Sequence, residues 1–255
     1  MSLLEIKNLH KAFGGLSAVL GVDFHLAKNE LVGLIGPNGA GKTTVFNLIT
    51  GVYRPDQGTI VFAEQSLVGL HPYEICKKGI ARTFQNIRLF RDLTVLDNVR
   101  IALHKDVTYG LLGAIFRTPG FFRGEIEMED RALEILRIFK LEHKRDEIAS
   151  NLPYGEQRRL EIARALATGP ALLILDEPAA GMNPQETQEL MQLIQWLRRE
   201  FDLTILLIEH DMALVMGVCE RIYVLDYGQV IAEGKPEEIR NNPKVIEAYL
   251  GEEVD

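Results

Sequence analysis

One stretch of eight residues decides how this sequence folds: Gly36-Pro37-Asn38-Gly39-Ala40-Gly41-Lys42-Thr43. It matches the pattern G-x-x-x-x-G-K-[ST] at every fixed position. The apolar run 31–35 before it predicts a buried strand, and the pattern from Lys42 to about Thr50 predicts a helix. Glycines allow backbone N–H groups to point at phosphate oxygens, and a helix N-terminus adds partial positive charge. The stretch therefore predicts a loop that binds nucleotide phosphates; the alternative is a glycine-rich turn with a surface lysine.

A second predicted strand ends in two acidic residues. Residues 171–175 form a continuous apolar run, typical of a buried parallel strand, and Asp176 and Glu177 follow directly. Carboxylates at such a position need compensation. We expect Asp176 to support Mg²⁺ through water, and Glu177 to activate or orient the water that attacks the γ-phosphate. The alternative is that both residues cap the next helix, since Asp-Glu-Pro is good capping chemistry.

The composition is that of an acidic globular protein. The chain has 255 residues, of which 47% are hydrophobic and 25% charged, and its formal net charge is −8. This charge argues against nucleic acid as a partner, because such proteins usually carry a basic surface. Two cysteines, Cys76 and Cys219, make neither a disulfide framework nor a four-ligand zinc site, which favours a reducing cytosol. The first residues are not typical of a secretory signal, and no apolar run reaches 18 residues.

The order of patterns along the chain predicts one domain with an inserted part. Residues 4–62 read mainly as strands and turns, and residues 86–151 have mostly helical spacing. Strands and helices then alternate again, ending in a hairpin with its turn at 226–229. These patterns predict an α/β fold with an N-terminal antiparallel β region and an inserted α-helical subdomain.

We place the core at about residues 1–85 and 158–255, and the helical subdomain at about 86–157. The stretch 109–124 is rich in glycine and phenylalanine, and we interpret it as a loop-like insertion into that subdomain. Its apolar rings, Phe116, Phe121 and Phe122, either pack locally or contact a partner.

Further segments make the chain resemble the ATP-binding subunits of ABC transporters. All occur in the family's order: Phe13 at the adenine-stacking position, Gln85 at the Q-loop, 152–157 at the LSGGQ signature, 180–183 at the D-loop and His210 at the switch histidine. The resemblance covers essentially the whole chain and implies an ABC-type P-loop NTPase. Two alternatives stay open: Tyr53 could replace Phe13 as the ring, and His210 could simply cap the next helix.

The signature segment departs from the family pattern. Pro153 stands where the family has the serine that faces the γ-phosphate of the other subunit's ATP, and Tyr154 replaces the first glycine. That contact is lost unless the Tyr154 hydroxyl or a backbone N–H substitutes. Gly155 keeps the close backbone approach, and Asn183 replaces the usual D-loop aspartate.

The resemblance implies ATP and Mg²⁺ as cofactors and assigns roles to residues. Glu177, His210 and Lys42 are the expected catalytic residues. Thr43, Gln85 and Asp176 are the expected metal ligands. The expected nucleotide-binding residues are Phe13, Gly36, Pro37, Asn38, Gly39, Ala40, Gly41, Lys42, Thr43, Thr44, Gln85, Tyr154, Gly155 and Glu156.

The segments 153–157 and 176–184 are most similar to the ATPase subunits of branched-chain (hydrophobic) amino-acid importers, as are the insertion and the tail. This similarity implies an energy-coupling subunit in which two ATPases close around two ATP molecules. The implied partners are two transmembrane permease subunits, a second, paralogous ATPase and, indirectly, a periplasmic binding protein. The implied location is peripheral, on the cytoplasmic face of the inner membrane. The alternatives are an importer for urea or amides and a soluble ABC ATPase outside transport.

Overall fold

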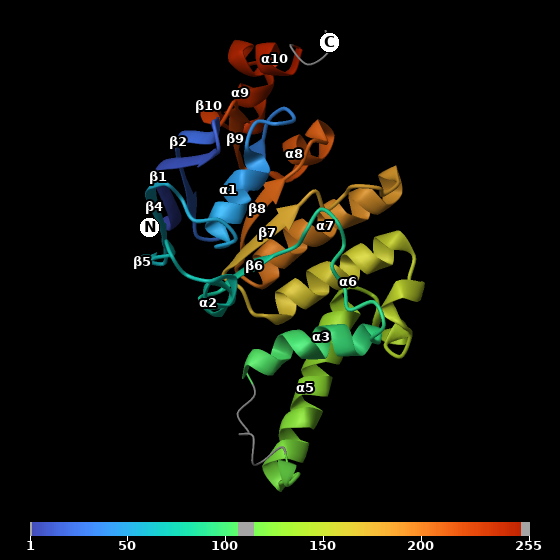
Figure 1. Cartoon of the computed structure of the whole chain (residues 1–255). Helices are drawn as coiled ribbons and strands as arrows, with labels where there is room; N and C mark the ends of the chain where they lie inside the picture. Colours follow the sequence, from blue (N-terminus) through green and yellow to red (C-terminus); the bar gives the residue numbers. More distant parts are fainter. Residues whose placement is uncertain (1, 107–114, 251–255) are drawn as a thin grey trace. The chain divides into compact units, whose positions relative to one another are not determined.

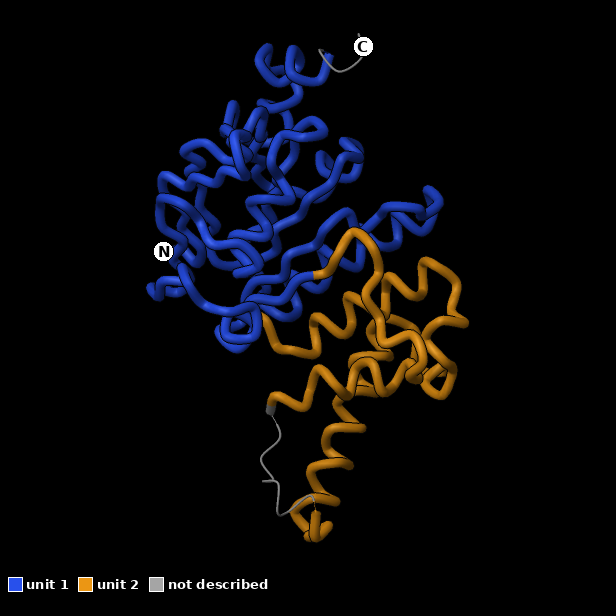
Figure 2. Tube along the Cα trace, viewed as in Figure 1, with its two compact units in different colours: residues 1–82, 171–255 blue, residues 83–170 orange. Residues whose placement is uncertain are grey.

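The computed structural model describes residues 2–106 and 115–250, and the chain divides into two compact units (Figures 1 and 2). Unit 1 comprises residues 1–82 and 171–255, and unit 2 comprises residues 83–170. The second division was predicted near residue 157, whereas the structure keeps the whole helix α6 (Tyr154–Ala167) in unit 2. The reason is packing, because α6 lies against two other helices of that unit.

Unit 1 contains a six-stranded sheet in the order β10-β9-β3-β8-β7-β6. Its strands are β3 (Leu31–Ile35), β6 (Ile80–Arg82), β7 (Leu172–Asp176), β8 (Thr204–Ile208), β9 (Arg221–Asp226) and β10 (Gln229–Gly234). All neighbours are parallel except β9 and β10, which form the predicted hairpin. Every residue of β3, β7 and β8 is buried, as their continuous apolar runs predict. The carboxyl ends of these three strands therefore meet at one sheet edge.

A second, antiparallel sheet covers the N-terminal part of unit 1 in the order β2-β1-β4-β5. Its strands are β1 (Ser2–Phe13), β2 (Leu16–Ala27), β4 (Gln57–Phe62) and β5 (Gln65–Ser66). Alternating apolar residues of β1 and β2 are buried in one core with residues of β3 and of helix α1 (Lys42–Ile49). The predicted α/β class with an N-terminal antiparallel region is confirmed.

The described part of unit 1 holds five more helices: α2 (Pro72–Lys77), α7 (Pro184–Glu200), α8 (Met212–Val218), α9 (Pro236–Arg240) and α10 (Pro243–Leu250). Helix α7 buries Leu190, Ile194 and Leu197, which are spaced at helical intervals on one face. Across the two described ranges, no helix combines the length and apolar character that crossing a bilayer requires.

Unit 2 is helical where the structure describes it. It contains α3 (Val95–Leu103), α5 (Pro119–Ile138), α6 and three short 3₁₀ turns, η1 (His104–Asp106), η2 (Glu142–Lys144) and η3 (Ala149–Asn151). Helix α3 packs against both α5 and α6. Thr94 caps α3 by accepting a hydrogen bond from the Asp97 N–H at 3.0 Å.

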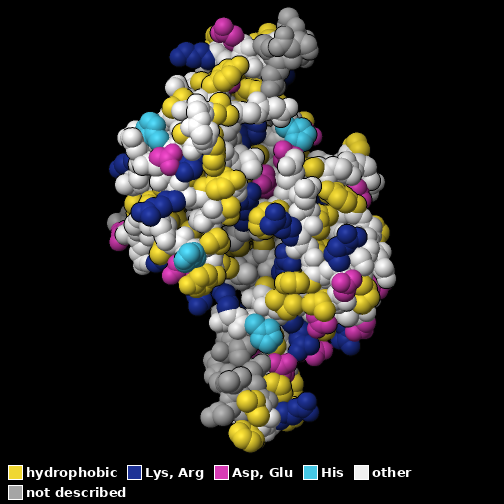
Figure 3. Space-filling model, in the orientation of Figure 1, with side chains coloured by type: hydrophobic (Ala, Val, Ile, Leu, Met, Phe, Trp, Pro, Cys, Tyr) yellow, Lys and Arg dark blue, Asp and Glu magenta, His cyan; other side chains and the backbone are white. Residues whose placement is uncertain are grey.

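The stretch 109–124 is not a loop throughout, and that interpretation is wrong for its second half. Residues 109–114 lie outside the described residues, but 119–124 form the first turns of α5, capped by Thr118 with Pro119 following. Two of the rings stay exposed, since Phe116 is 74% exposed and Phe122 is also exposed, whereas Phe121 is half-buried and contacts the Phe122 ring edge-on, with centroids 5.5 Å apart. Apolar side chains accordingly show at the N-terminal end of α5 in the space-filling view (Figure 3).

Candidate functional site

The phosphate loop connects β3 to α1, as predicted, and two of its glycines are required by close contacts. Gly36 (φ +149°) and Gly41 (φ +100°) both adopt positive φ. A Cβ on Gly36 would lie 1.9 Å from the Leu225 carbonyl oxygen, and one on Gly41 would lie 2.4 Å from that of Ala18. The loop therefore packs directly on two backbone segments, and any side chain at these positions would displace it.

Lys42 folds back over this loop. Its Nζ donates to the carbonyl oxygens of Gly36 at 2.5 Å and Pro37 at 2.7 Å. Thr43 and Thr44 occupy the first turn of α1, and Thr43 is exposed. An ammonium group at a helix N-terminus behind a glycine loop suits a polyphosphate. The arrangement fits the predicted roles of these residues in phosphate binding.

Asp176 ends β7 and forms an ion pair that the sequence analysis did not foresee. The Arg82 guanidinium, at the end of the adjacent strand β6, donates from Nη2 to Asp176 Oδ2 at 2.9 Å, and each side chain is 8% exposed. Arg82 also donates to Asn47 Oδ1 at 2.7 Å. The pair compensates a carboxylate that burial alone would disfavour. The sequence feature that could have indicated this ion pair is an arginine, Arg82, at the end of a short apolar strand.

Glu177 and His210 lie at the ends of adjacent parallel strands, β7 and β8. Glu177 has a φ of +44°, an unusual value for a residue with a side chain, and its N–H donates to the Ile208 carbonyl at 2.9 Å. This bend brings its Oε2 to 3.8 Å from His210 Nδ1. The two predicted catalytic side chains are therefore brought together.

Asp176, Glu177 and His210 do not cap the helices that follow them. Asn183 caps α7, accepting from the Glu186 N–H at 3.0 Å, so Asp176 and Glu177 do not cap that helix. Asp211 caps α8 by accepting from two backbone N–H groups, so His210 does not. Both capping alternatives are wrong, and the capping function of Asn183 accounts for its polar side chain in the D-loop.

Glu209 is a further buried acid in this place, and the sequence analysis missed it. Its side chain is 1% exposed, and its Oε1 accepts from the Ala179 N–H at 2.9 Å. Burial raises the pKa of Glu209 above the ordinary glutamate value, although that hydrogen bond and nearby His210 oppose the shift. Glu209 thus ties the turn after Glu177 to the end of β8. A charged residue within an apolar strand end was the signal.

Phe13 and Tyr53, which the sequence left as alternatives for the adenine ring, lie together. Their ring centroids are 5.0 Å apart at 69°, in edge-to-face contact. The Lys11 Nζ lies 5.4 Å from the Phe13 ring centroid. Both rings remain exposed, so the pair offers an aromatic surface for a base.

Gln85 and residues 154–156 belong to unit 2. The Gln85 carbonyl accepts from Arg158 Nη2 at 2.7 Å. Tyr154, Gly155 and Glu156 form the first turn of α6, where Pro153 occupies the cap position without a side-chain hydrogen bond. Gly155 is buried, Tyr154 is 45% exposed, and Glu156 Oε2 pairs with the Lys144 Nζ at 2.6 Å.

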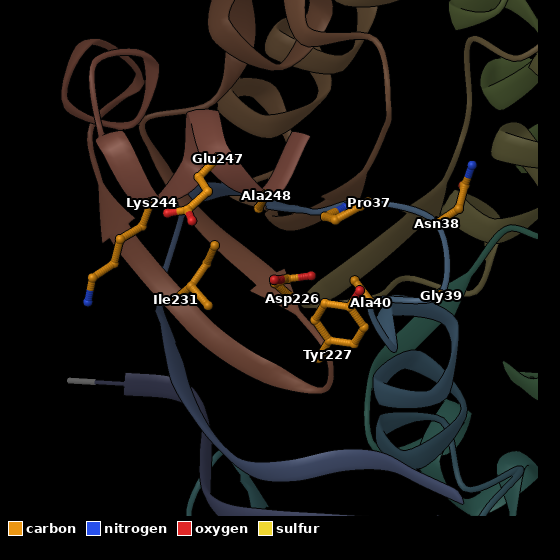
Figure 4. Close-up of a pocket in the computed structure, with 10 residues that line it drawn as sticks. All are labelled: Pro37, Asn38, Gly39, Ala40, Asp226, Tyr227, Ile231, Lys244, Glu247 and Ala248. Carbon is orange, nitrogen blue, oxygen red and sulfur yellow. The ribbon is translucent and has the colours of Figure 1, made fainter. Parts of the chain in front are cut away.

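A cavity of about 480 Å³ borders the phosphate loop within unit 1 (Figure 4). Its walls are residues 37–40, the turn residues Asp226 and Tyr227, and residues of β10 and α10. The Gly228 N–H of the same turn donates to the Ala40 carbonyl at 3.0 Å. The C-terminal part of the chain therefore contacts the nucleotide loop, a relation that the sequence analysis did not predict.

Comparison with known proteins places the chain in a family. The family description ABC transporter matches residues 19–180, and the description branched-chain amino acid ATP-binding cassette transporter matches 229–255. The chain is 55% identical over 251 residues to the high-affinity branched-chain amino acid transport ATP-binding protein LivG of Salmonella typhimurium, covering 98% of each chain.

Two solved structures extend the likeness to the fold. The ADP conformation of MJ1267, an ATP-binding cassette of an ABC transporter, matches with a TM-score of 0.85 and 34% identity, over 98% of this chain and 99% of that one. A dimeric post-hydrolysis state of the cassette MJ0796, bound to ADP and Pi, matches with a TM-score of 0.78 and 28% identity, over 91% and 98%. The chain belongs to the ABC transporter family, as one of its ATP-binding cassettes.

Proposed function

We propose that this chain is the ATP-hydrolysing, energy-coupling subunit of an importer for branched-chain amino acids. The observation that carries the catalytic part is the shared sheet edge of unit 1. The phosphate loop, the Asp176–Glu177 pair and His210 lie at the carboxyl ends of three parallel strands that are consecutive in the sheet, in the order β3-β8-β7. The cargo is supported by the name and the full-length similarity of the Salmonella relative.

In this proposal the loop and Lys42 bind the β- and γ-phosphates of ATP. Glu177 accepts the proton of the attacking water, and His210, 3.8 Å from it, donates to the γ-phosphate and so detects its loss. The bent backbone at Glu177 fixes the carboxylate before the substrate arrives. Phe13, with Tyr53 against its edge, stacks on adenine.

Thr43 and Asp176 would hold Mg²⁺, which neutralises charge on the phosphate oxygens. Their oxygens are the donors that this ion prefers. The described residues contain no group of three acidic, histidine or cysteine side chains that could hold a metal alone.

One chain supplies only part of each ATP site, so a complete site requires a second ATPase subunit. We propose that residues 154–156 contact the ATP held by a second, paralogous subunit, as the dimeric state of the similar cassette MJ0796 supports. Closing and opening of the two ATPases would move two permease subunits at the cytoplasmic face of the membrane. A periplasmic binding protein would deliver the cargo. The exposed rings of Phe116 and Phe122 are available for a permease contact.

A pull-down from gently solubilised native membranes tests the proposal. The tagged full chain should recover two hydrophobic permease subunits and a second ATPase. The periplasmic protein that docks on those permeases should bind leucine, isoleucine or valine in binding assays. If that binding protein instead bound urea or amides, the proposed cargo would be wrong and urea or amides would take its place. Recovery with ribosomes, and without permeases, would contradict transport and favour a soluble ATPase.

A further inference from the structure

A fully buried arginine lies at the centre of unit 2. Arg158 is on α6, one turn after Tyr154, and its side chain is 0% exposed. A guanidinium stays charged in proteins, so its burial requires that most of its N–H groups are paired. Both Nη atoms of Arg158 are paired, whereas its buried Nε has no hydrogen-bond partner among the described residues. The bonds that pair it lead to both segments of unit 2 that are expected to meet nucleotide.

The first segment is the backbone around Gln85. Arg158 Nη1 donates to the Phe84 carbonyl at 2.5 Å, and Nη2 donates to the Gln85 carbonyl at 2.7 Å. Two donors of one rigid, planar group thus hold two successive carbonyls. These two hydrogen bonds fix the backbone at Gln85, and so the direction in which the Gln85 side chain leaves it.

The second segment is the start of α6. Arg158 Nη2 also donates to the Tyr154 hydroxyl oxygen at 3.2 Å, and the Tyr154 side chain is 45% exposed. Because the hydroxyl accepts from Arg158, its own hydrogen is available for donation to another group. Tyr154 follows Pro153, which stands where the family signature has a serine and which carries no hydroxyl.

Glu161 holds the arginine in place. Its Oε2 accepts from Arg158 Nη1 at 2.9 Å, and its Oε1 accepts from the Arg88 N–H at 3.0 Å. Burial raises the pKa of Glu161, and these bonds, with the charge of Arg158, act against that rise. The carboxylate therefore joins the segment after Gln85 to the same guanidinium.

We infer that Arg158 is a positioning residue that joins the Gln85 backbone and the Tyr154 hydroxyl into one rigid group. The two nucleotide-facing parts of unit 2 then move as one, and the tyrosine hydroxyl, oriented by a cation, replaces the missing serine. The inference rests on the ATP hydrolysis of the proposed function and not on the cargo. The competing explanation is that Arg158 only stabilises the interior of unit 2.

The test uses the full chain assembled with the second ATPase subunit and the permeases, carrying Arg158→Lys or Arg158→Met, with Arg137→Met as the matched control. Arg137 is exposed on α5 of the same unit, so its replacement removes the same charge from the surface. We expect Arg158→Met to lower kcat by about 10- to 100-fold, as a misplaced contact does. The Kd for a fluorescent ATP analogue should change little, because the phosphate loop belongs to unit 1. Arg158→Lys should restore part of kcat, since an ammonium can reach one carbonyl but cannot form the fork.

Tyr154→Phe completes a double-mutant cycle that a purely structural role would not satisfy. It removes one hydroxyl and should lower kcat when made by itself, but its effect on kcat should be much smaller in the Arg158→Lys background. Additive effects, or equal losses of ATP binding and kcat, would overturn the inference.

Amide hydrogen exchange separates this inference from the proposed function. Arg158→Lys should raise exchange at residues 84–86 and 154–156 together, whether or not the chain hydrolyses ATP. Unchanged exchange at 84–86 would overturn the inference even in an active enzyme. A wild-type chain without ATPase activity would contradict the proposed function, while the exchange result would still decide the role of Arg158.

Discussion

Replacing Arg82 with methionine should destabilise unit 1 far more than a surface substitution does. The Arg82 guanidinium joins the ends of β6 and β7 through Asp176 at 2.9 Å, and it reaches α1 through Asn47 at 2.7 Å. Methionine keeps most of the packing of the stem over the Phe46 ring, from which the guanidinium carbon is 5.5 Å away. The substitution therefore removes mainly the polar contacts.

The magnitude follows from those contacts. A hydrogen bond to a charged group contributes about 1.5–3 kcal/mol, and removing one partner of a buried ion pair costs about 3–5 kcal/mol. Because each side chain is 8% exposed, we take the lower part of the second range. Arg82→Met should lower the free energy of unfolding by about 3 kcal/mol. Asp176→Asn should cost less, because Arg82 keeps its bond to Asn47, and the coupling between the two sites should be about 1–3 kcal/mol.

Trp196 provides the assay. It is the single tryptophan of the chain and lies on α7, so its fluorescence follows the unfolding of unit 1 in urea. Arg240→Met, an exposed arginine on α9, is the matched control and should change stability by less than about 0.5 kcal/mol. A coupling below about 0.5 kcal/mol in the Arg82–Asp176 cycle would refute the reasoning, because the pair would then be no stronger than an exposed one.

Three further substitutions give separate tests. Glu177→Gln should reduce steady-state ATP turnover by about 100-fold or more while ATP binding persists, and intact turnover would show that another group activates the water. Gly36→Ala should lower the free energy of unfolding by about 3 kcal/mol or more and abolish ATP binding, because its Cβ would lie 1.9 Å from a carbonyl oxygen. Gly39→Ala, with open space around its Cβ, should lower it by only about 1 kcal/mol. Equal losses for the two variants in urea unfolding and ATP titration would contradict this. Burial raises the pKa of Glu209, so the folded state disfavours its charged form and its contribution to stability is lost as pH rises from the ordinary glutamate pKa through the raised one. Glu209→Gln should remove that decline, and unfolding curves at several pH values that match the wild type would refute it.

Several parts of this protein follow from local sequence. The strand–loop–helix around Gly36–Thr43 is specified by glycines at fixed spacing and by the apolar run before them, and β3 begins and ends where that run does. The strands before Asp176 and His210 are likewise continuous apolar runs, buried at every residue. The start of α5 was also encoded locally, in Thr118 and Pro119, although the aromatic residues after it suggested a loop.

The charge partners were decided only by the tertiary structure. Arg82 lies 94 residues from Asp176, and Arg158 lies 73 residues from Gln85. Which strand neighbours which, and which helix faces which loop, sets these pairs, and a pattern of three or four residues carries no record of that order. The sequence alone thus determined that a phosphate loop and two acids exist in a cassette of this family. The structure determined that a buried arginine compensates one acid, that bent backbone aims the other at His210, and that Arg158 holds Tyr154 and Gln85 together, because buried charges must find partners wherever the fold brings them.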